Sequence, residues 1–433
     1  MSKQYKKKTL LCKIGITMIL IYSFFIGLKS AFFNSSYGLM IWIFIASACI
    51  VIAAGFKKNK NNLVVISWIC ILIMIVNRNS RFSHGFIKMD LGIITLFVLF
   101  TFLQSFSDWH GFFLSIMMLL GLFYTSSTIF LFLFPQVYLT YVVPMFGTTQ
   151  SLRIMIYNAK HGMAVGFSAH YSTTAIYLVS TIAVPISAFM RKRFTFKSKK
   201  FYGFMSVLTV VTIFLTGKRA HSLFVVAAAL FCYYAFNRDK KFGSAFKIIV
   251  FIIFAVVVYI IAAQFIQPLQ NIIIRFQKTM AGGDVTVGRL DMLNECISMF
   301  KSNYLIGTGW GSFTYYTSSG LMNAHNVFAQ LLAENGLILS IPFFAFIIMS
   351  FSHAMKVAKS LFSISNPTRT QYLSIVYSVF IQTFFLMYCL TGNPLYDFQM
   401  LCPYIFGCSI VEYYYQRMCV SKTQIESVEV LAE

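Results

Sequence analysis

The sequence predicts an all-α, polytopic membrane protein, and composition is the first observation behind this prediction. Apolar residues make up 58% of the 433 residues and charged residues only 11%, which lies outside the range of soluble globular domains. Spacing is the second observation, because the apolar residues occur in runs of about 14–24 residues, long enough to cross a hydrocarbon core about 30 Å thick. The third is a net charge of +23 that is divided unevenly between alternate loops.

The apolar runs predict about 12 transmembrane helices. The third run is short, and the fourth contains Lys88 and Asp90 near its start, where charge is costly. The first run is followed by Lys29 and Asn34 without a small-residue cleavage site, so we expect no cleaved signal peptide. The runs lie at 9–28, 38–56, 63–76, 87–104, 112–134, 170–190, 201–216, 220–236, 246–266, 326–352, 371–391 and 395–416.

The basic residues predict topology rather than nucleic-acid binding. With the N-terminus in the cytoplasm, cytoplasmic segments hold 22 of the 35 lysines and arginines, outer segments hold 12, and Lys13 lies within the first span. Cytoplasmic loops of membrane proteins usually carry such an excess. An even number of spans also returns the C-terminus to the cytoplasm. We therefore expect a multi-pass protein of the cell membrane with both termini cytoplasmic and no nucleic-acid partner.

The nine cysteines predict neither a disulfide framework nor a zinc site. Eight of them lie in or beside apolar runs, and the sequence has no CxxC pair and no His/Cys cluster. Only Cys296 lies in the largest outer loop. We expect no metal and no cofactor.

The predicted spans divide the chain into three parts. Residues 1–266 form an N-terminal bundle of spans one to nine with an outer loop at 135–169. Residues 267–325 form a large extracytoplasmic loop, and residues 326–433 hold spans 10 to 12 and a cytoplasmic tail. Loops of this length are usually functional or disordered.

The large loop contains a predicted amphipathic helix that begins near Arg289. Polar residues flank its apolar positions, and Gly307 lies beyond its end. The helix favours a functional loop over a disordered one. Its apolar positions recur at helical spacing: Val287, Leu290, Leu293, Ile297 and Phe300.

The run GTGWG (307–311) resembles a nucleotide-binding loop only superficially. A dinucleotide loop follows a strand and opens a helix, whereas here a helix precedes the glycines. We interpret the run as a turn that lets the backbone pass close to another segment. Anion binding by its backbone amides is the alternative.

Four basic residues from distant parts of the chain are predicted to meet at the outer face. Arg219 joins spans seven and eight, Arg275 follows span nine, Arg289 starts the amphipathic helix, and His325 lies where span ten begins. Guanidinium groups bind phosphates bidentately and stay charged at physiological pH. This set suits a lipid phosphate or pyrophosphate, and contact with lipid headgroups is the alternative for each arginine.

The segments that carry these residues resemble a known family. GRLDMLNECISMFKSNYLIGTGWGSF and NAHNVFAQLLAENGLI are similar to the signature of the O-antigen ligase/polymerase family (Wzy/WaaL-type membrane glycosyltransferases), in which His is followed by a small polar residue, nine residues and Gly. His325, Asn326 and Gly336 fit this spacing. TGKRAHSLFVV resembles the family's Arg-led segment, although Lys218 stands where a small residue is usual and Ala220 replaces glycine.

The resemblance implies a metal-independent, inverting transferase that uses an undecaprenyl-pyrophosphate-linked oligosaccharide as donor. Arg219 and Arg289 would bind the pyrophosphate, with Arg275 as a third candidate. His325 would act as general base on the acceptor hydroxyl, and a histidine that only hydrogen-bonds sugar is the alternative. Asn326 and Lys218 would support these residues. Preplaced cations suit a leaving group that gains negative charge in the transition state.

Glu334 and the aromatic residues of the loop each allow two interpretations. Glu334 lies nine residues beyond His325, about 13 Å along a straight helix and on another face, so it cannot orient His325 unless the histidine belongs to the loop. We interpret Glu334 as a buried partner of a polar group on a neighbouring span, with a proton or lipid role as the alternative. Trp310, Phe313, Tyr315 and Tyr316 could stack on sugars or form an interfacial belt.

Within the family, we expect a polymerase that extends a surface polysaccharide, such as a capsule, by whole repeat units. A composition rich in Phe, Ile, Lys and Asn is typical of a source without a lipopolysaccharide core, which favours a polymerase over a ligase. A flippase is the alternative from another class, but internal repeats and charges near the bilayer midplane are lacking. Expected partners are the lipid-linked oligosaccharide, membrane lipid, a chain-length regulator and a flippase.

Overall fold

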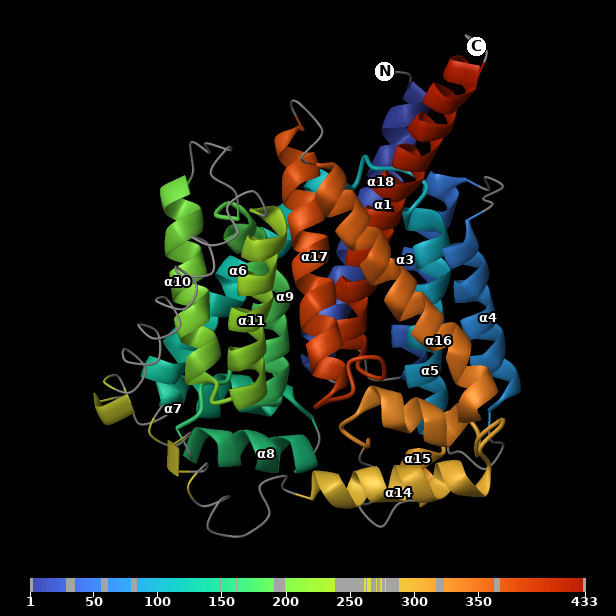
Figure 1. Ribbon diagram of the computed structural model, residues 1–433. Helices are drawn as coiled ribbons and strands as arrows, with labels where there is room; N and C mark the ends of the chain where they lie inside the picture. The colour runs from blue at the N-terminus through green and yellow to red at the C-terminus, as the bar shows by residue number, and fades with distance from the viewer. Residues whose placement is uncertain are drawn as a thin grey trace.

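The computed structural model describes residues 3–28, 36–55, 61–78, 84–147, 149–160, 162–190, 199–237, 288–316, 323–361 and 367–430, with isolated positions between 261 and 277. Within these residues the protein is helical, and Arg78 and Trp310 form its single β bridge. Both termini lie at one end of a helical bundle (Figure 1). Three helices lie at the opposite end: α8 (Thr149–Lys160), α14 (Arg289–Ser302) and α15 (Phe313–Tyr316).

The predicted spans agree with helices of the structure, except for the ninth, which lies almost entirely outside the described residues. Five described helices are long and apolar enough to cross a membrane, which supports a membrane protein. The total of 12 spans stays a prediction. The matching helices are α1 (Lys3–Phe25), α3 (Ser36–Ala54), α4 (Asn62–Val76), α5 (His84–Leu103), α6 (His110–Leu133), α9 (Tyr171–Ser187), α10 (Lys199–Leu215), α11 (Arg219–Phe236), α16 (Val327–Ser360), α17 (Arg369–Cys389) and α18 (Phe398–Val430).

Helix α17 lies at the centre of the bundle. It packs against α6, α9, α11, α16 and α18, and nearly all of its residues are buried. Outer helices instead expose large apolar side chains, such as Phe44 at 75%, Val76 at 73% and Phe204 at 61%. Lipid is as apolar as these side chains, so a lateral surface of this kind suits a bilayer.

The acidic residue of α5, Asp90, is paired near the N-terminal end of the helix. The Asp90 carboxylate lies 3.8 Å from the guanidinium of Arg78, and the indole of Trp310 donates a hydrogen bond of 3.0 Å to it. An acidic residue in an apolar helix is therefore paired, as intramembrane charges generally are.

Helix α16 is broken at Gly336, which has φ 62° and ψ −170°. The backbone groups freed by the break bond to the turn before the glycine-rich run. The amides of Leu337 and Ile338 donate to the carbonyls of Tyr304 and Leu305, at 2.8 and 3.0 Å. Backbone polar groups in an apolar environment need such partners, so the outer loop completes the broken helix.

The amphipathic helix predicted near Arg289 is present as α14, but its buried face differs from the prediction. Leu290 and Ile297 are 54% and 43% exposed. The side chains that face the bundle are instead Cys296, which is buried, with Met292 and Met299 beside it. Both sets of residues, Leu290 with Ile297 and Met292 with Cys296 and Met299, have helical spacing. Periodicity alone could therefore not decide which set faces the bundle.

Candidate functional site

His325 stands at the mouth of α16, in the connection that precedes the helix. Asn326 is the N-cap of α16, and its Oδ1 accepts a hydrogen bond of 3.0 Å from the amide of Ala329. His325 itself has φ 55°, a left-handed conformation that is uncommon for a residue with a Cβ. The histidine therefore belongs to the loop and not to the helix.

Lys218 and Arg289 are the basic residues that the structure places near His325, and Arg219 lies near Lys218. Arg219 begins α11, with Lys218 as its N-cap, and Arg289 begins α14. Arg289 and Lys218 are close enough to His325 to shift its titration. The two helix N-termini add partial positive charge at the same place, which favours an anion. Arg275, the remaining predicted arginine, lies outside the described residues.

The pKa of His325 is lowered to about 4. Burial is the largest cause, and the positive charges of Arg289 and Lys218 add to it. The ring is therefore neutral near pH 7, and a neutral imidazole is the form that can accept a proton. Bound pyrophosphate would offset the two charges and raise the pKa of the ring, which would strengthen it as a base.

The pKa of Lys218 is lowered to about 8. Burial is again the largest cause, followed by the charges of Arg289 and Arg219. Lys218, Arg219 and Arg289 are thus close enough together for the two arginines to disfavour the charged form of the lysine. A bound anion would relieve this repulsion.

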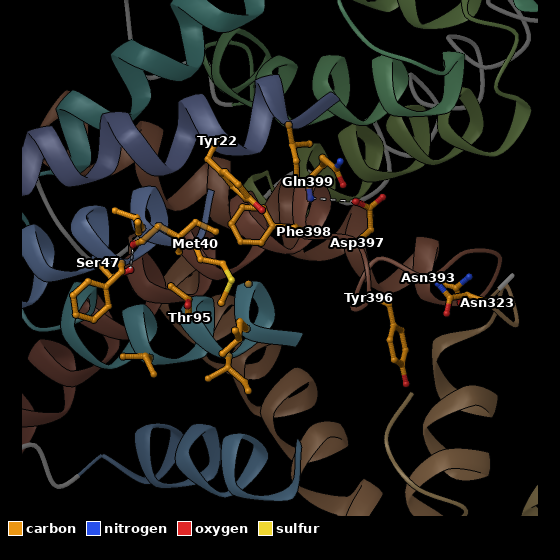
Figure 2. Close-up of a pocket in the computed structure, with 18 of the residues that line it drawn as sticks. Tyr22, Met40, Ser47, Thr95, Asn323, Asn393, Tyr396, Asp397, Phe398 and Gln399 are labelled. Atoms are coloured by element: carbon orange, nitrogen blue, oxygen red, sulfur yellow. Dashed lines mark hydrogen bonds between the residues drawn. The ribbon is translucent and has the colours of Figure 1, made fainter. Parts of the chain in front are cut away.

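His325 also lines a cavity of about 1310 Å³. The cavity has a polar end near His325 and a mostly apolar arm between α1, α3 and α5 (Figure 2), where Ile43, Phe44 and Val98 lie. A cavity with one polar end and one apolar arm suits an amphipathic ligand. The polar end is formed by Asn323, His325, Tyr388, Asn393, Tyr396, Asp397 and Gln399.

Sequence reasoning missed the residues of this polar end that come from the α17–α18 connection. Asp397 caps α18 by accepting a hydrogen bond of 3.1 Å from the amide of Gln399 (Figure 2). Asn393 and Tyr396 lie on the same connection. The signal was a polar TGNPLYD stretch (391–397) between two apolar runs, at the outer end of the last predicted pair of spans.

The glycine-rich run 307–311 packs backbone to backbone against α16. A Cβ on Gly307 would lie 2.3 Å from the carbonyl carbon of Glu334, and one on Gly336 would lie 2.4 Å from that of Leu305. The amides of Thr308 and Gly309 donate to the carbonyls of Ala333 and Glu334. These amides are therefore engaged by the protein, which favours the turn interpretation over the anion-binding alternative.

Glu334 is fully buried beneath this turn. One carboxylate oxygen accepts from the Gln330 amide at 2.9 Å and from the Phe313 backbone amide at 3.3 Å. The other accepts from the Tyr396 hydroxyl at 2.8 Å. The predicted polar partner on a neighbouring span is thus a tyrosine of the α17–α18 connection, together with groups of the loop and of α16 itself.

The aromatic residues of the loop divide into two pairs. Trp310 and Phe313 are buried, and Trp310 stacks between Phe343 and Tyr396 with ring centroids 5.3 and 5.1 Å away. Stacking on sugar is therefore wrong for this pair. Tyr315 and Tyr316 remain about half exposed.

The described residues contain no group of three or more His, Cys, Asp or Glu side chains that could hold a metal ion. The positive charge at the site comes instead from Lys218, Arg219 and Arg289. All nine cysteines are free thiols.

The fold and the site define a helical membrane protein with a neutral histidine between a cationic cluster and an amphipathic cavity. A family model described as O-Antigen ligase matches residues 204–344, which hold Lys218, Arg219, Arg289 and His325. Over this segment the chain is identified with the O-antigen ligase/polymerase family, which confirms the resemblance seen in its motifs. Members are typically glycosyltransferase-like membrane enzymes that process glycans. No curated protein matches the chain.

Proposed function

We propose that the protein polymerises undecaprenyl-pyrophosphate-linked oligosaccharide repeat units into a surface polysaccharide on the outer face of the cell membrane. The observation that carries this proposal is the position of His325. Its neutral ring lies close enough to Arg289 and Lys218 to respond to their charges, and it lines the polar end of the amphipathic cavity. A lipid-linked pyrophosphate and an acceptor hydroxyl could therefore meet at this ring.

The proposed reaction is a single inverting displacement. The acceptor hydroxyl oxygen attacks the anomeric carbon of the donor sugar as the bond from that carbon to the pyrophosphate oxygen breaks. His325 accepts the hydroxyl proton, and the bonding electrons leave with the pyrophosphate. General-base catalysis of this kind contributes about 100- to 10,000-fold to the rate.

The cations stabilise the departing pyrophosphate in this proposal. Arg219 and Arg289 bind it, with Arg275 as a third candidate, and Lys218 adds a charge. Charge that develops on the leaving group strengthens these contacts in the transition state, so no metal ion is required. Asn326 supports His325 by capping α16, and Glu334 supports the loop and Tyr396.

The cavity accounts for the lipid part of the substrate. Its apolar arm lies between helices α1, α3 and α5, and it is lined in part by the exposed apolar side chains Ile41 and Phe44 of α3. A polyprenyl chain can lie in this arm while its pyrophosphate reaches the polar end.

Deletion of the gene in the source strain tests the proposal. Surface glycans and lipid-linked intermediates are then separated by size. Loss of polymer with accumulation of single repeat units on the carrier supports a polymerase. Accumulation of long chains on the carrier would show a ligase instead, and loss of every outer-face intermediate would show a flippase.

A further inference from the structure

His325 is the one residue other than glycine with positive φ among the described residues. A residue with a Cβ adopts this conformation only where its neighbours fix it, and such residues concentrate at functional sites. The residues on either side of His325 are both held by hydrogen bonds. Asn326 caps α16, and the amide of Ala324 donates to the side-chain oxygen of Gln330 at 3.0 Å.

Gln330 is the side chain that links this loop to α16. It is fully buried, and its amide nitrogen donates to Asn323 Oδ1 at 3.0 Å and to Glu334 Oε1 at 2.9 Å. Its hydrogen-bonding groups are thus satisfied by three partners. Two of those partners, Asn323 and Ala324, directly precede His325 in the chain.

Glu334 determines which way the Gln330 amide points. Glu334 Oε1 also accepts from the Phe313 backbone amide, so it acts as an acceptor and faces the nitrogen of the glutamine amide. The oxygen of that amide then faces the Ala324 backbone amide. Glu334 is itself fixed by the Phe313 amide and the Tyr396 hydroxyl.

We propose that Gln330 is a positioning residue that holds His325 in its left-handed conformation, and that Glu334 fixes the orientation of Gln330. The same hydrogen bonds place Asn323 and Tyr396 in the wall of the cavity. The ring of His325 and the polar end of the cavity are therefore set by one buried network. The positioning role follows from geometry alone, and its effect on catalysis rests on the proposed function.

The test uses Gln330→Met, which keeps the length of the side chain and removes its hydrogen bonds. Gln382→Met is a matched control, because Gln382 is also fully buried and its oxygen accepts from Ser350 at 3.1 Å within the bundle. Glu334→Gln is the second variant. It retains an acceptor oxygen but no longer determines the orientation of the Gln330 amide.

The first measurement needs no substrate. Purified protein is treated with diethyl pyrocarbonate at pH 6, and acylation of His325 is followed by mass spectrometry of its peptide. We expect His325 to react several-fold faster in Gln330→Met, because the ring leaves its half-buried position. Gln382→Met should match the wild type, and Glu334→Gln should be intermediate.

The second measurement is transfer from lipid-linked oligosaccharide extracted from the deletion strain. Gln330→Met should lower kcat by about 100-fold, the usual effect of a small misplacement, with little change in KM because the cations are intact. Equal His325 acylation in Gln330→Met, Glu334→Gln and the wild type would overturn the proposal. If the wild type transfers no glycan, the proposed function fails, and the acylation rates still decide the positioning role. If Gln330→Met does not fold, Glu334→Gln decides it.

Discussion

Two histidines near opposite ends of α16 have opposite surroundings. His325 lies before the helix, beside cations and a cavity, and no described residue hydrogen-bonds its ring. His353 lies near the far end, with Nδ1 2.7 Å from Glu412 Oε2 and its ring stacked on Tyr415 at 3.6 Å. Glu412 also accepts from Asn61 at 2.6 Å. A histidine satisfied by a carboxylate stabilises packing, whereas a ring that no described residue hydrogen-bonds, close to Arg289 and Lys218, fits the proposed role as a base.

The largest expected effect on this comparison comes from His325→Ala. Removal of the base should lower the rate of transfer by about 100- to 10,000-fold, while the level of folded protein and donor binding stay near normal. The measurement is single-turnover transfer from extracted lipid-linked donor, with donor binding measured separately. Wild-type activity in this variant would refute the site.

Arg289→Lys should have the next largest effect. Lysine keeps the charge but loses the bidentate fork, so donor affinity should fall by about tenfold, the cost of one charge-assisted hydrogen bond. Donor titration against the detergent-solubilised protein measures this affinity. Lys301→Arg, at the other end of α14, is the control and should bind as the wild type does.

The pH profile tests the two shifted groups of the cluster. The pKa of Lys218 is about 8, so its positive charge is lost as pH rises through this value, and kcat/KM should fall there. The pKa of His325 is about 4, so the neutral base is lost only as pH falls through that value. Values of kcat/KM, which report the free protein, should therefore be flat on the acid side between pH 5 and pH 7 and should fall toward pH 9.

Lys218→Arg tests whether Lys218 causes the alkaline decline of this profile. Arginine stays charged over the whole range, so the alkaline decline should disappear in this variant. An unchanged alkaline limb would assign it to another group.

His353→Ala should have the smallest effect on transfer and a clear effect on stability. Removal of one partner of a buried pair costs about 3–5 kcal/mol, because Glu412 Oε2 is left buried without a partner while Asn61 bonds only Oε1. We expect a lower unfolding temperature by fluorescence in detergent and a kcat of the remaining folded protein close to the wild type. A large loss of kcat would show that the two histidines do not differ as described.

Local spacing in the sequence predicted where the candidate residues stand relative to the helices. The start of α14 at Arg289, the start of α11 at Arg219 and the place of His325 before α16 all followed from where polar residues interrupt apolar runs. These positions depend on neighbours in sequence. Their convergence on one face followed from counting spans.

Features that depend on distant packing were not predicted. Asp397 and Asn393 enter the cavity wall because the α17–α18 connection lies near α5 and His325. Trp310 is buried because the glycines around it let the turn approach α16, and its hydrophobicity alone fitted an interfacial position equally well. The amide orientation of Gln330 depends on Glu334 one turn away and on partners in the loop.

The contact between Gly307 and Gly336 closes the chain segment that contains His325 at its base. Gly307 packs against the backbone beside Gly336, and Gly336 packs against the backbone beside Gly307. The junction therefore acts as a noncovalent cross-link. The conformational entropy of closing such a loop is lost when the bundle folds, so substrate binding does not bear this cost. The loop that carries His325 is therefore already ordered without substrate. A side chain added at Gly307 or Gly336 should increase the mobility of this loop without contacting the site.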